Sequence, residues 1–333
     1  MINRRMLVVV SGVLLTTPAA RTQPAGKVYR VAYFGYTAYN TPDDERFLAA
    51  FVQRLRELGF AEGRNLVIEW RYAEGKMERF AEFAAEMVKL KVDVVVVTSG
   101  EAARAVMAAS RTMPIVGIFL PDPVRAGLVA SMGRPGGQLT GIYHLGPELT
   151  LKHLDLLKAA VPAATRAAFM GCPRCELDAG LSAAEVAAIL NERTAAARSI
   201  GLTFLSFDVN APSDFDSAGA AMLRARADAL LIGPTSVNHL LRAKWLAFAE
   251  QHRLPTIAGG TGWGAMLSYA ADPADHFAKA VDYVSKILGG ASPGEIPMEQ
   301  PTTFQFVINL KMAKAMGLTI PQSLLLRADE VIQ

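Results

Sequence analysis

Four consecutive valines, Val94 to Val97, constrain the fold of this chain more than any other feature. A half-exposed strand alternates apolar and polar residues, whereas an unbroken β-branched run suits a strand that is buried on both faces. Such strands occur in parallel sheets whose two faces are covered by helices. The run therefore predicts an α/β fold with helices packed on both sides of a central sheet.

Strands and amphipathic helices alternate on both sides of the valine run, which predicts doubly wound α/β architecture. In the first half, the expected strands are 28–34, 66–70, 92–97 and 115–119, and the expected helices are 47–58, 77–90 and 102–110. In the second half, the expected strands are 166–170, 202–208, 229–232, 256–258 and 266–269, and the expected helices are 149–160, 183–200, 215–226, 239–252 and 274–288. Residues 301–310 are expected to be extended.

Two glycine-rich segments, 134–137 and 259–264, divide the pattern into two similar units. A chain of 333 residues usually forms two domains, although one large sheet is an alternative. We expect an N-terminal lobe of residues 26–140 and 264–296. The expected C-terminal lobe comprises residues 141–263 and 297–333, and a cleft lies between the two lobes.

Residues 1–25 have the pattern of a secretory signal peptide. Arg4 and Arg5 precede an apolar run from Met6 to Leu15, and small residues follow. The run is shorter than the roughly 20 residues that span a bilayer. The paired arginines also resemble a twin-arginine export signal. A buried first helix is the alternative, but Pro18 would break it. We therefore expect an exported, periplasmic chain that is not embedded in the membrane.

The composition and motifs exclude several classes of function. The formal net charge is +3, which falls to +1 without Arg4 and Arg5, so there is no electrostatic case for a nucleic-acid partner. Nucleophile-elbow, zinc-protease and phosphate-loop motifs are absent, and the histidines lack metal-ligand spacing. No feature demands catalysis, and we expect neither a cofactor nor a metal.

Cys172 and Cys175 have thioredoxin-like spacing and follow an expected strand. A redox enzyme needs a cysteine of low pKa. Glu176 and Asp178 follow at once, and their negative charge disfavours a thiolate. In an oxidising compartment, a local disulfide is the favoured interpretation.

Loops at the carboxyl ends of parallel strands line the ligand crevice of open α/β sheets. Tyr36, Tyr39 and Trp263 could supply flat walls for an apolar ligand, or could simply pack. The residues that this rule and the glycine cluster nominate are Tyr36, Thr98, Ser99, Gly100, Glu101, Asp122, Pro123, Cys172, Thr235, Ser236, Asn238 and Trp263.

Two expected helix starts, 98–101 and 234–238, offer hydroxyls and free N–H groups to a ligand carboxylate. Thr98 and Glu101 also fit a capping box, which is a purely structural role. Since Glu101 would repel an anion, the first start is better suited to an amine or hydroxyl, and the second is favoured for a carboxylate. Asp122 could receive an amine or shape a turn.

Seven segments together resemble a family of ABC-transporter substrate-binding proteins of the tryptophan/tyrosine type. They cover nearly the whole chain after the leader. These segments are 58–65 (LGFAEGRN), 122–129 (DPVRAGLV), 134–137 (RPGG), 300–304 (QPTTF), 307–311 (VINLK), 315–321 (AMGLTIP) and 327–332 (RADEVI).

The resemblance implies a type I periplasmic-binding-protein fold, in which two lobes joined by a three-crossing hinge close on a small ligand. It also implies an amino-acid-like or aromatic ligand, and a membrane permease with its cytoplasmic ATPase as partners. A monomer is expected. Two features depart from the family: Glu101 stands where an uncharged residue such as Thr is common, and the segment from Cys172 to Asn191 is unusual.

These observations favour a periplasmic solute-binding component of an importer. One alternative is an exported enzyme that uses the same cleft, either a hydrolase or a thiol oxidoreductase acting through Cys172 and Cys175. The other alternative is a ligand-sensing module that docks on a membrane receptor.

Overall fold

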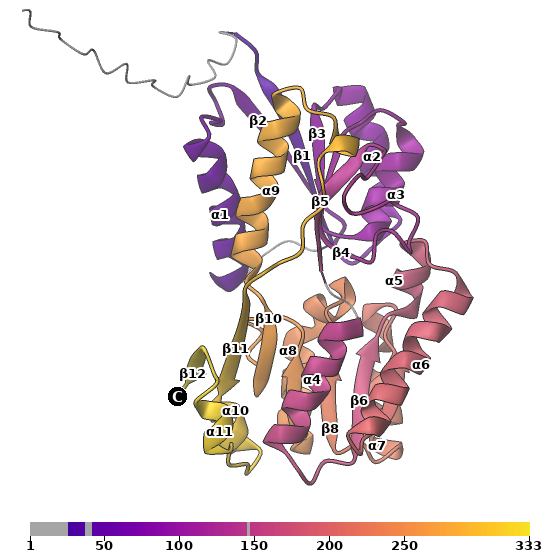
Figure 1. Ribbon diagram of the computed structural model, residues 1–333, viewed down its shortest axis with the longest axis vertical. Helices are drawn as coiled ribbons and strands as arrows, with labels where there is room; N and C mark the ends of the chain where they lie inside the picture. The colour runs from indigo at the N-terminus through magenta and orange to yellow at the C-terminus, as the bar shows by residue number, and fades with distance from the viewer. Residues whose placement is uncertain (1–25, 37–41, 145–146) are drawn as a thin grey trace, which may run out of the picture.

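The computed structural model describes residues 26–36, 42–144 and 147–333. The signal peptide predicted at 1–25 lies outside these ranges, and so does Tyr39. The described chain forms two α/β lobes, one above the other in Figure 1, and each lobe is built on its own sheet. Within the described ranges, no helix combines the length and the apolar character needed to cross a membrane.

The first sheet is parallel and has the strand order β2-β1-β3-β4-β5. Its strands are β1 (Tyr29–Gly35), β2 (Leu66–Tyr72), β3 (Val94–Val97), β4 (Ile115–Pro121) and β5 (Leu139–His144). The valine run forms the central strand β3, and all of its residues are buried. This confirms the strand that the run predicted.

Successive valines of β3 face opposite helical layers. Val94 and Val96 belong to the cluster that contains Phe51 and Phe277, whereas Val95 and Val97 pack with Phe80. Figure 1 shows the same division, with α1 (Pro42–Glu57) and α9 (Pro273–Leu288) on one side of the sheet and α2 (Arg79–Leu90) and α3 (Gly100–Ala109) on the other.

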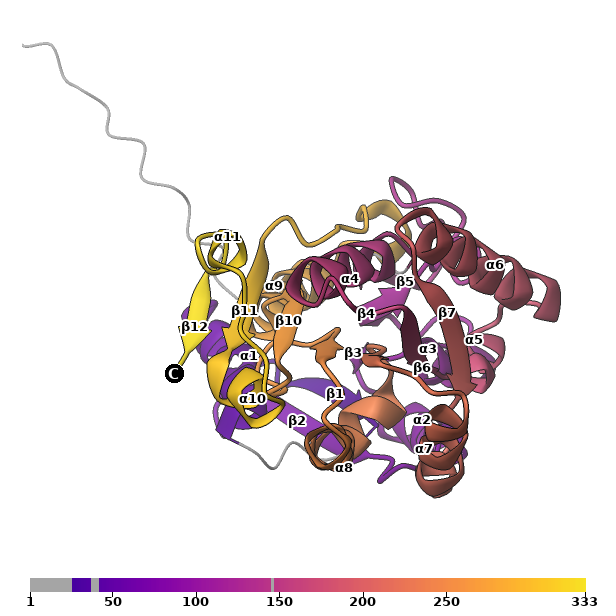
Figure 2. The same cartoon turned by 90° about the horizontal axis from the view of Figure 1, so that it is seen from below.

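The second sheet has the order β12-β11-β10-β9-β8-β6-β7, and only the β10–β11 pair is antiparallel among the described pairings. Figure 2 shows α4 and α6 on one face of this sheet and α7 and α8 on the other. Its strands are β6 (Arg166–Gly171), β7 (Thr203–Asp208), β8 (Ala229–Ile232), β9 (Thr256–Ala258), β10 (Leu267–Ala271), β11 (Phe304–Asn309) and β12 (Glu330–Ile332). The helices are α4 (Pro147–Ala160), α5 (Pro173–Asp178), α6 (Ala183–Ser199), α7 (Phe215–Arg224), α8 (Ser236–His252), α10 (Leu310–Ala315) and α11 (Gln322–Leu325).

The chain passes between the sheets after β5, after β10 and before β11. The expected boundaries at 140/141 and 263/264 are therefore wrong. Strand β5 continues the first sheet to His144 because it pairs with β4. Strand β10 belongs to the second sheet because it pairs with β9, so α9 rather than β10 returns to the first lobe. The expected boundary at 296/297 also falls early, since Glu299 still bridges to β5.

Candidate functional site

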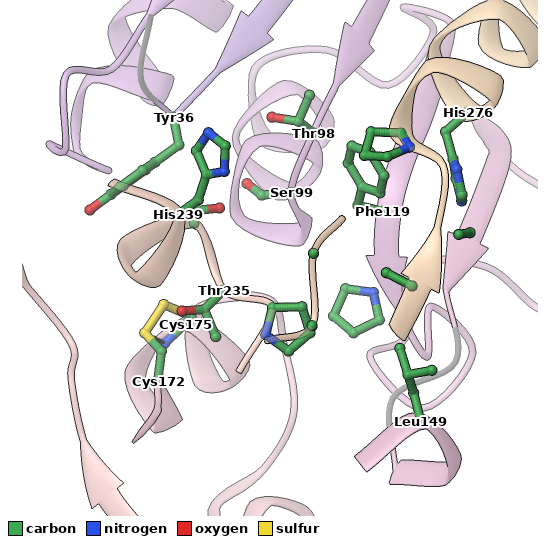
Figure 3. A pocket seen from close by; sticks show the side chains of 18 of the residues that line it. Tyr36, Thr98, Ser99, Phe119, Leu149, Cys172, Cys175, Thr235, His239 and His276 are labelled. Atoms are coloured by element: carbon green, nitrogen blue, oxygen red, sulfur yellow. Dashed lines mark hydrogen bonds between the residues drawn. A yellow bond between two sulfur atoms is a disulfide. The ribbon is translucent and has the colours of Figure 1, made fainter. Parts of the chain in front are cut away.

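A cavity of about 240 Å³ lies between the two lobes. Its wall is built from the carboxyl ends of strands and the first turns of helices, as the crevice rule predicts. Figure 3 shows side chains of the first lobe, among them Tyr36 and Thr98, facing the disulfide and Thr235 of the second lobe. A ligand in this space would touch both lobes at once.

The loop from β3 into α3 forms the wall on the first-lobe side. The Thr98 hydroxyl donates to the Phe34 carbonyl at 3.2 Å, which ties this loop to β1. Ser99 is the N-cap of α3, and its hydroxyl accepts from the Ala102 N–H at 3.3 Å. The capping box expected from Thr98 and Glu101 is therefore wrong, because the helix begins one residue later than that pairing requires.

Phe119 reaches the cavity through an unusual backbone. Its φ of 61° lies in the left-handed region, and the register of β4 against β5 shifts between Gly117 and Leu120. A bulge of this kind redirects a side chain, and non-glycine residues with positive φ often mark functional sites. The ring lies 5.0 Å from the ring of His276 and 5.9 Å from that of Phe277.

Two short segments form the wall on the second-lobe side. Cys172 and Cys175 are joined by a disulfide, and the Cys172 sulfur also accepts from the Cys175 N–H at the start of α5. Thr235 caps α8, where its hydroxyl accepts from the Asn238 N–H at 3.2 Å. Trp263 adds an aromatic face, with its ring 5.7 Å from that of His239.

Glu101 is a half-buried acid in the wall of the cavity. Burial raises the pKa of its carboxyl group to about 7, although hydrogen bonds from its own N–H and from Ser99 lower it in part. The nearby Asp178 raises it further. Burial, followed by the charge of Glu101, raises the pKa of Tyr36 to about 12. The Tyr36 hydroxyl donates to the Gly75 carbonyl at 3.0 Å.

Glu176 and Arg193 form an ion pair in the wall that the sequence analysis missed. Their charged groups are 3.7 Å apart, and the Arg193 side chain is only 12% exposed. The guanidinium also lies 4.9 Å from the centre of the Phe169 ring. Burial raises the pKa of Glu176, and burial lowers the pKa of Arg193. A signal was available, since Ile189, Arg193 and Ala197 recur at the spacing of one helix face.

His276 is a second residue that the sequence analysis did not nominate. Its Nδ1 lies 3.0 Å from the Asp272 carbonyl oxygen, which can only accept, so Nδ1 carries the proton and Nε2 is an acceptor. This Nε2 is buried and has no hydrogen-bond partner. Burial lowers the pKa of His276, so the neutral ring is favoured. A ligand donor could therefore bind at Nε2.

The structure gathers most of the nominated residues around one cavity. Three nominated residues lie elsewhere, namely Asp122, Pro123 and Asn238. The nominated residues that line the cavity are Tyr36, Thr98, Ser99, Gly100, Glu101, Cys172, Thr235, Ser236 and Trp263.

Asn238 and Asp122 have structural roles instead. The Asn238 side chain is fully buried, donates to the Met170 and Gly233 carbonyls and accepts from the Trp245 indole N–H. It therefore fixes α8 to the sheet and has no group left for a ligand. Asp122 accepts from the Arg125 N–H at 3.1 Å and shapes the turn after β4, which also contains the buried Pro123.

The described side chains include no cluster of three or more His, Cys, Asp or Glu that could hold a metal ion. The polar groups of the cavity are instead spread along an apolar wall. Its rings come from both lobes, with Tyr36 and Phe119 on one side and Phe169, Trp263 and Phe304 on the other. The arrangement suits a small, largely apolar organic molecule with few polar groups.

Comparison with known proteins identifies the family. Residues 44–332 match the sequence model of the family described as ABC transporter substrate binding protein. The chain belongs to this family. Among its relatives, a tyrosine-binding protein of Clostridioides difficile (strain R20291) is 24% identical over 281 residues, covering 83% of this chain and 78% of that protein.

Solved structures confirm the fold of this substrate-binding protein. A conserved domain protein from Vibrio cholerae O1 matches with a TM-score of 0.82 and 24% identity, over 92% of this chain and all of the other. An ABC domain from Streptococcus pneumoniae, in complex with L-Trp, matches with a TM-score of 0.81 and 22% identity over the same shares. A ligand-free, open substrate-binding protein from Clostridium difficile, 20% identical, gives a TM-score of 0.62 over 92% of this chain and 99% of that one.

Proposed function

We propose that this chain is the solute-binding component of an importer, which captures a small organic ligand between its lobes and delivers it to a membrane permease. The observation that carries the proposal is the position of the cavity, because its wall is divided between the two lobes. A ligand that contacts both lobes favours the closed form, and this differential affinity is what drives closure.

The lining supports a ligand with an aromatic or similar flat apolar group. Aromatic rings from both lobes face the cavity. Relatives described as binding tyrosine and L-Trp are consistent with such a group. A cavity of about 240 Å³ leaves room for a compact molecule rather than for a polymer.

The arrangement of the lobes supports a closed form. The Arg104 side chain of α3, in the first lobe, donates to the Ala179 carbonyl of the second lobe at 2.6 Å. The molecule is also more similar to the complex with L-Trp than to the ligand-free, open structure, with TM-scores of 0.81 and 0.62. Arg104 would therefore act as a latch that forms when the lobes meet.

The setting of the protein is part of the same proposal. We infer that residues 1–25 direct export, with the paired arginines Arg4 and Arg5 serving a twin-arginine signal, and are then removed. The mature protein acts in the periplasm as a monomer. The permease would bind the closed lobes, and a cytoplasmic ATPase would drive transport. We also infer that the ligand leaves the protein chemically unchanged, as binding rather than catalysis requires.

The test is to recover the ligand and follow its effect. Small molecules released by denaturing the purified protein are identified by mass spectrometry, and the ligand-depleted protein is titrated with each. We expect one of them to raise the thermal stability and reduce the radius of gyration in X-ray scattering, and to be recovered intact. Trp263→Ala should weaken its binding. A ligand that emerges chemically altered would contradict the proposal.

A further inference from the structure

This inference rests on the proposed function and concerns the charge of the ligand. Among the described residues that line the cavity, the acids are Glu101 and Glu176, and Arg193 is the only lysine or arginine. Arg193 lies 3.7 Å from Glu176, so these two charges offset each other. Glu101 forms no ion pair with any described residue. When both acids are ionised, the described wall carries one uncompensated negative charge.

Glu101 also occupies the place where a ligand anion would otherwise bind. It is the second residue of α3, after the N-cap Ser99, at the positive end of the helix. Hydrogen bonding from its own N–H and from Ser99 lowers the pKa of its carboxyl group in part, so both groups act on this carboxylate. A ligand carboxylate at this helix start would meet a like charge, and the Ala102 N–H there already donates to the Ser99 hydroxyl.

The other places for a ligand carboxylate are poorly suited as well. At the start of α8, the N-cap Thr235 already accepts from the Asn238 N–H. No lysine or arginine among the described residues lines the wall there. Arg193 stacks on Phe169 and its Nη1 pairs with Glu176 at 3.7 Å, so a ligand carboxylate that took this charge would have to compete with Glu176, although the buried Nε of Arg193 has no hydrogen-bond partner. Leaving Glu176 without its partner in a half-buried position costs free energy.

A cation, in contrast, finds a prepared site beside Glu101. Tyr36 lies close enough for the charge of Glu101 to act on its hydroxyl, and its ring belongs to the same wall. Aromatic faces attract organic cations. The groups that act on the charge of Glu101 are Ser99, the N-cap of α3, and Asp178 on α5, and Glu101 in turn acts on Tyr36 after β1; none of the three is cationic.

We propose that the ligand is a small organic cation, an aromatic or other apolar body with a protonated amine and no carboxylate, whose amine pairs with Glu101. The ammonium group supplies the charge partner that Glu101 lacks within the protein. The apolar body occupies the ring-lined part of the cavity. Glu101 is thus the residue that sets specificity for amines over amino acids.

The experiment compares matched pairs by isothermal titration calorimetry at neutral pH. The pairs are tryptamine with tryptophan, tyramine with tyrosine, and phenethylamine with phenylalanine, and 3-phenylpropionate is the anionic member. In the wild-type protein, at least one amine should bind at least tenfold more tightly than its amino acid, and 3-phenylpropionate should bind most weakly. Glu101→Gln should weaken amine binding by about tenfold or more, as expected for the loss of a charge-assisted hydrogen bond.

Glu82→Gln is the matched control, because Glu82 is an exposed acid in the first turn of α2. It should bind the amines like the wild type. Tighter binding of the amino acids than of the amines would overturn the inference, and so would the failure of all three amines to bind. The comparison within the wild type needs no variant to fold. If an amino acid rather than an amine reduced the radius of gyration of the protein, the proposed receptor function would stand, but the proposed specificity for amines would be wrong.

Discussion

A methyl group at Gly100 would test how the two lobes meet. Gly100 is the first residue of α3 in the first lobe, and a Cβ built on it lies 2.6 Å from the Cβ of Ala179 in the second lobe. Carbon atoms in contact are about 3.5–4 Å apart. Gly100→Ala therefore requires the lobes to separate by roughly 1 Å at this point. The backbone itself accepts alanine, since Gly100 has helical geometry.

The cost of this substitution falls on the closed form. Overpacking in a tight contact costs about 1–3 kcal/mol, and the open form avoids it because the two residues move apart. If the ligand binds the closed form, its affinity should fall by the same free energy, about 5- to 150-fold. The free energy of unfolding should change little, because alanine is favoured over glycine in a helix.

Calorimetric titration with the ligand recovered from the protein measures this effect. Gly133→Ala is the control, since a Cβ there has no atom within 4 Å. In the double variant Gly100→Ala with Ala179→Gly, the clashing atom is removed and most of the affinity should return. Wild-type affinity in Gly100→Ala, or no recovery in the double variant, would show that these residues do not meet in the liganded state.

Three further predictions concern stability and the disulfide. Because burial raises the pKa of Glu101 to about 7 from the usual 4.5, the folded state retains a proton that the unfolded state releases. The free energy of unfolding should therefore fall by roughly 1–3 kcal/mol as the pH rises from 4.5 to about 7. Urea titrations should show this decrease, and Glu101→Gln should remove the part that Glu101 contributes, since the raised pKa of Glu176 adds a decrease of its own. Replacing Cys172 and Cys175 by serine should cost about 2 kcal/mol in the same assay. Ligand affinity should stay within a few-fold, whereas a thiol oxidoreductase would lose its function. Asn238→Ala should lower the free energy of unfolding by about 2–4 kcal/mol, since it removes three buried hydrogen bonds, including the one from Trp245. An unchanged urea midpoint in that variant would contradict the structural role.

The parallel strands were predictable because burial on both faces leaves a continuous apolar run, as in β3. Strand β5 was missed because Thr140 and Gly141 interrupt its apolar character. Its pairing depends on close backbone approach, since a Cβ at Gly141 would lie 2.1 Å from the Gly117 oxygen. That requirement is a property of two distant segments, and neither segment shows it alone.

The candidate site was predictable where residues follow strands directly, because the crevice rule places those loops at one edge of each sheet. It was less predictable where tertiary structure decides the direction of a side chain. Phe119 enters the cavity through a bulge, His276 comes from α9 after the return crossing, and Arg193 lies inside α6. Asn238 was misassigned because a polar residue at a helix start satisfies the backbone as readily as it binds a ligand.

The return of α9 to the first lobe has a consequence for synthesis. The Arg54 side chain bonds to Asp282, a partner 228 residues later in the chain. The first lobe therefore lacks one of its covering helices until β6 to β10 of the second lobe have left the ribosome. Such late, non-local completion slows folding and keeps apolar strand faces accessible to chaperones. A chain built in this order stays incompletely folded during most of its synthesis. Because each lobe contains segments from both halves of the sequence, a single truncation cannot produce either lobe alone.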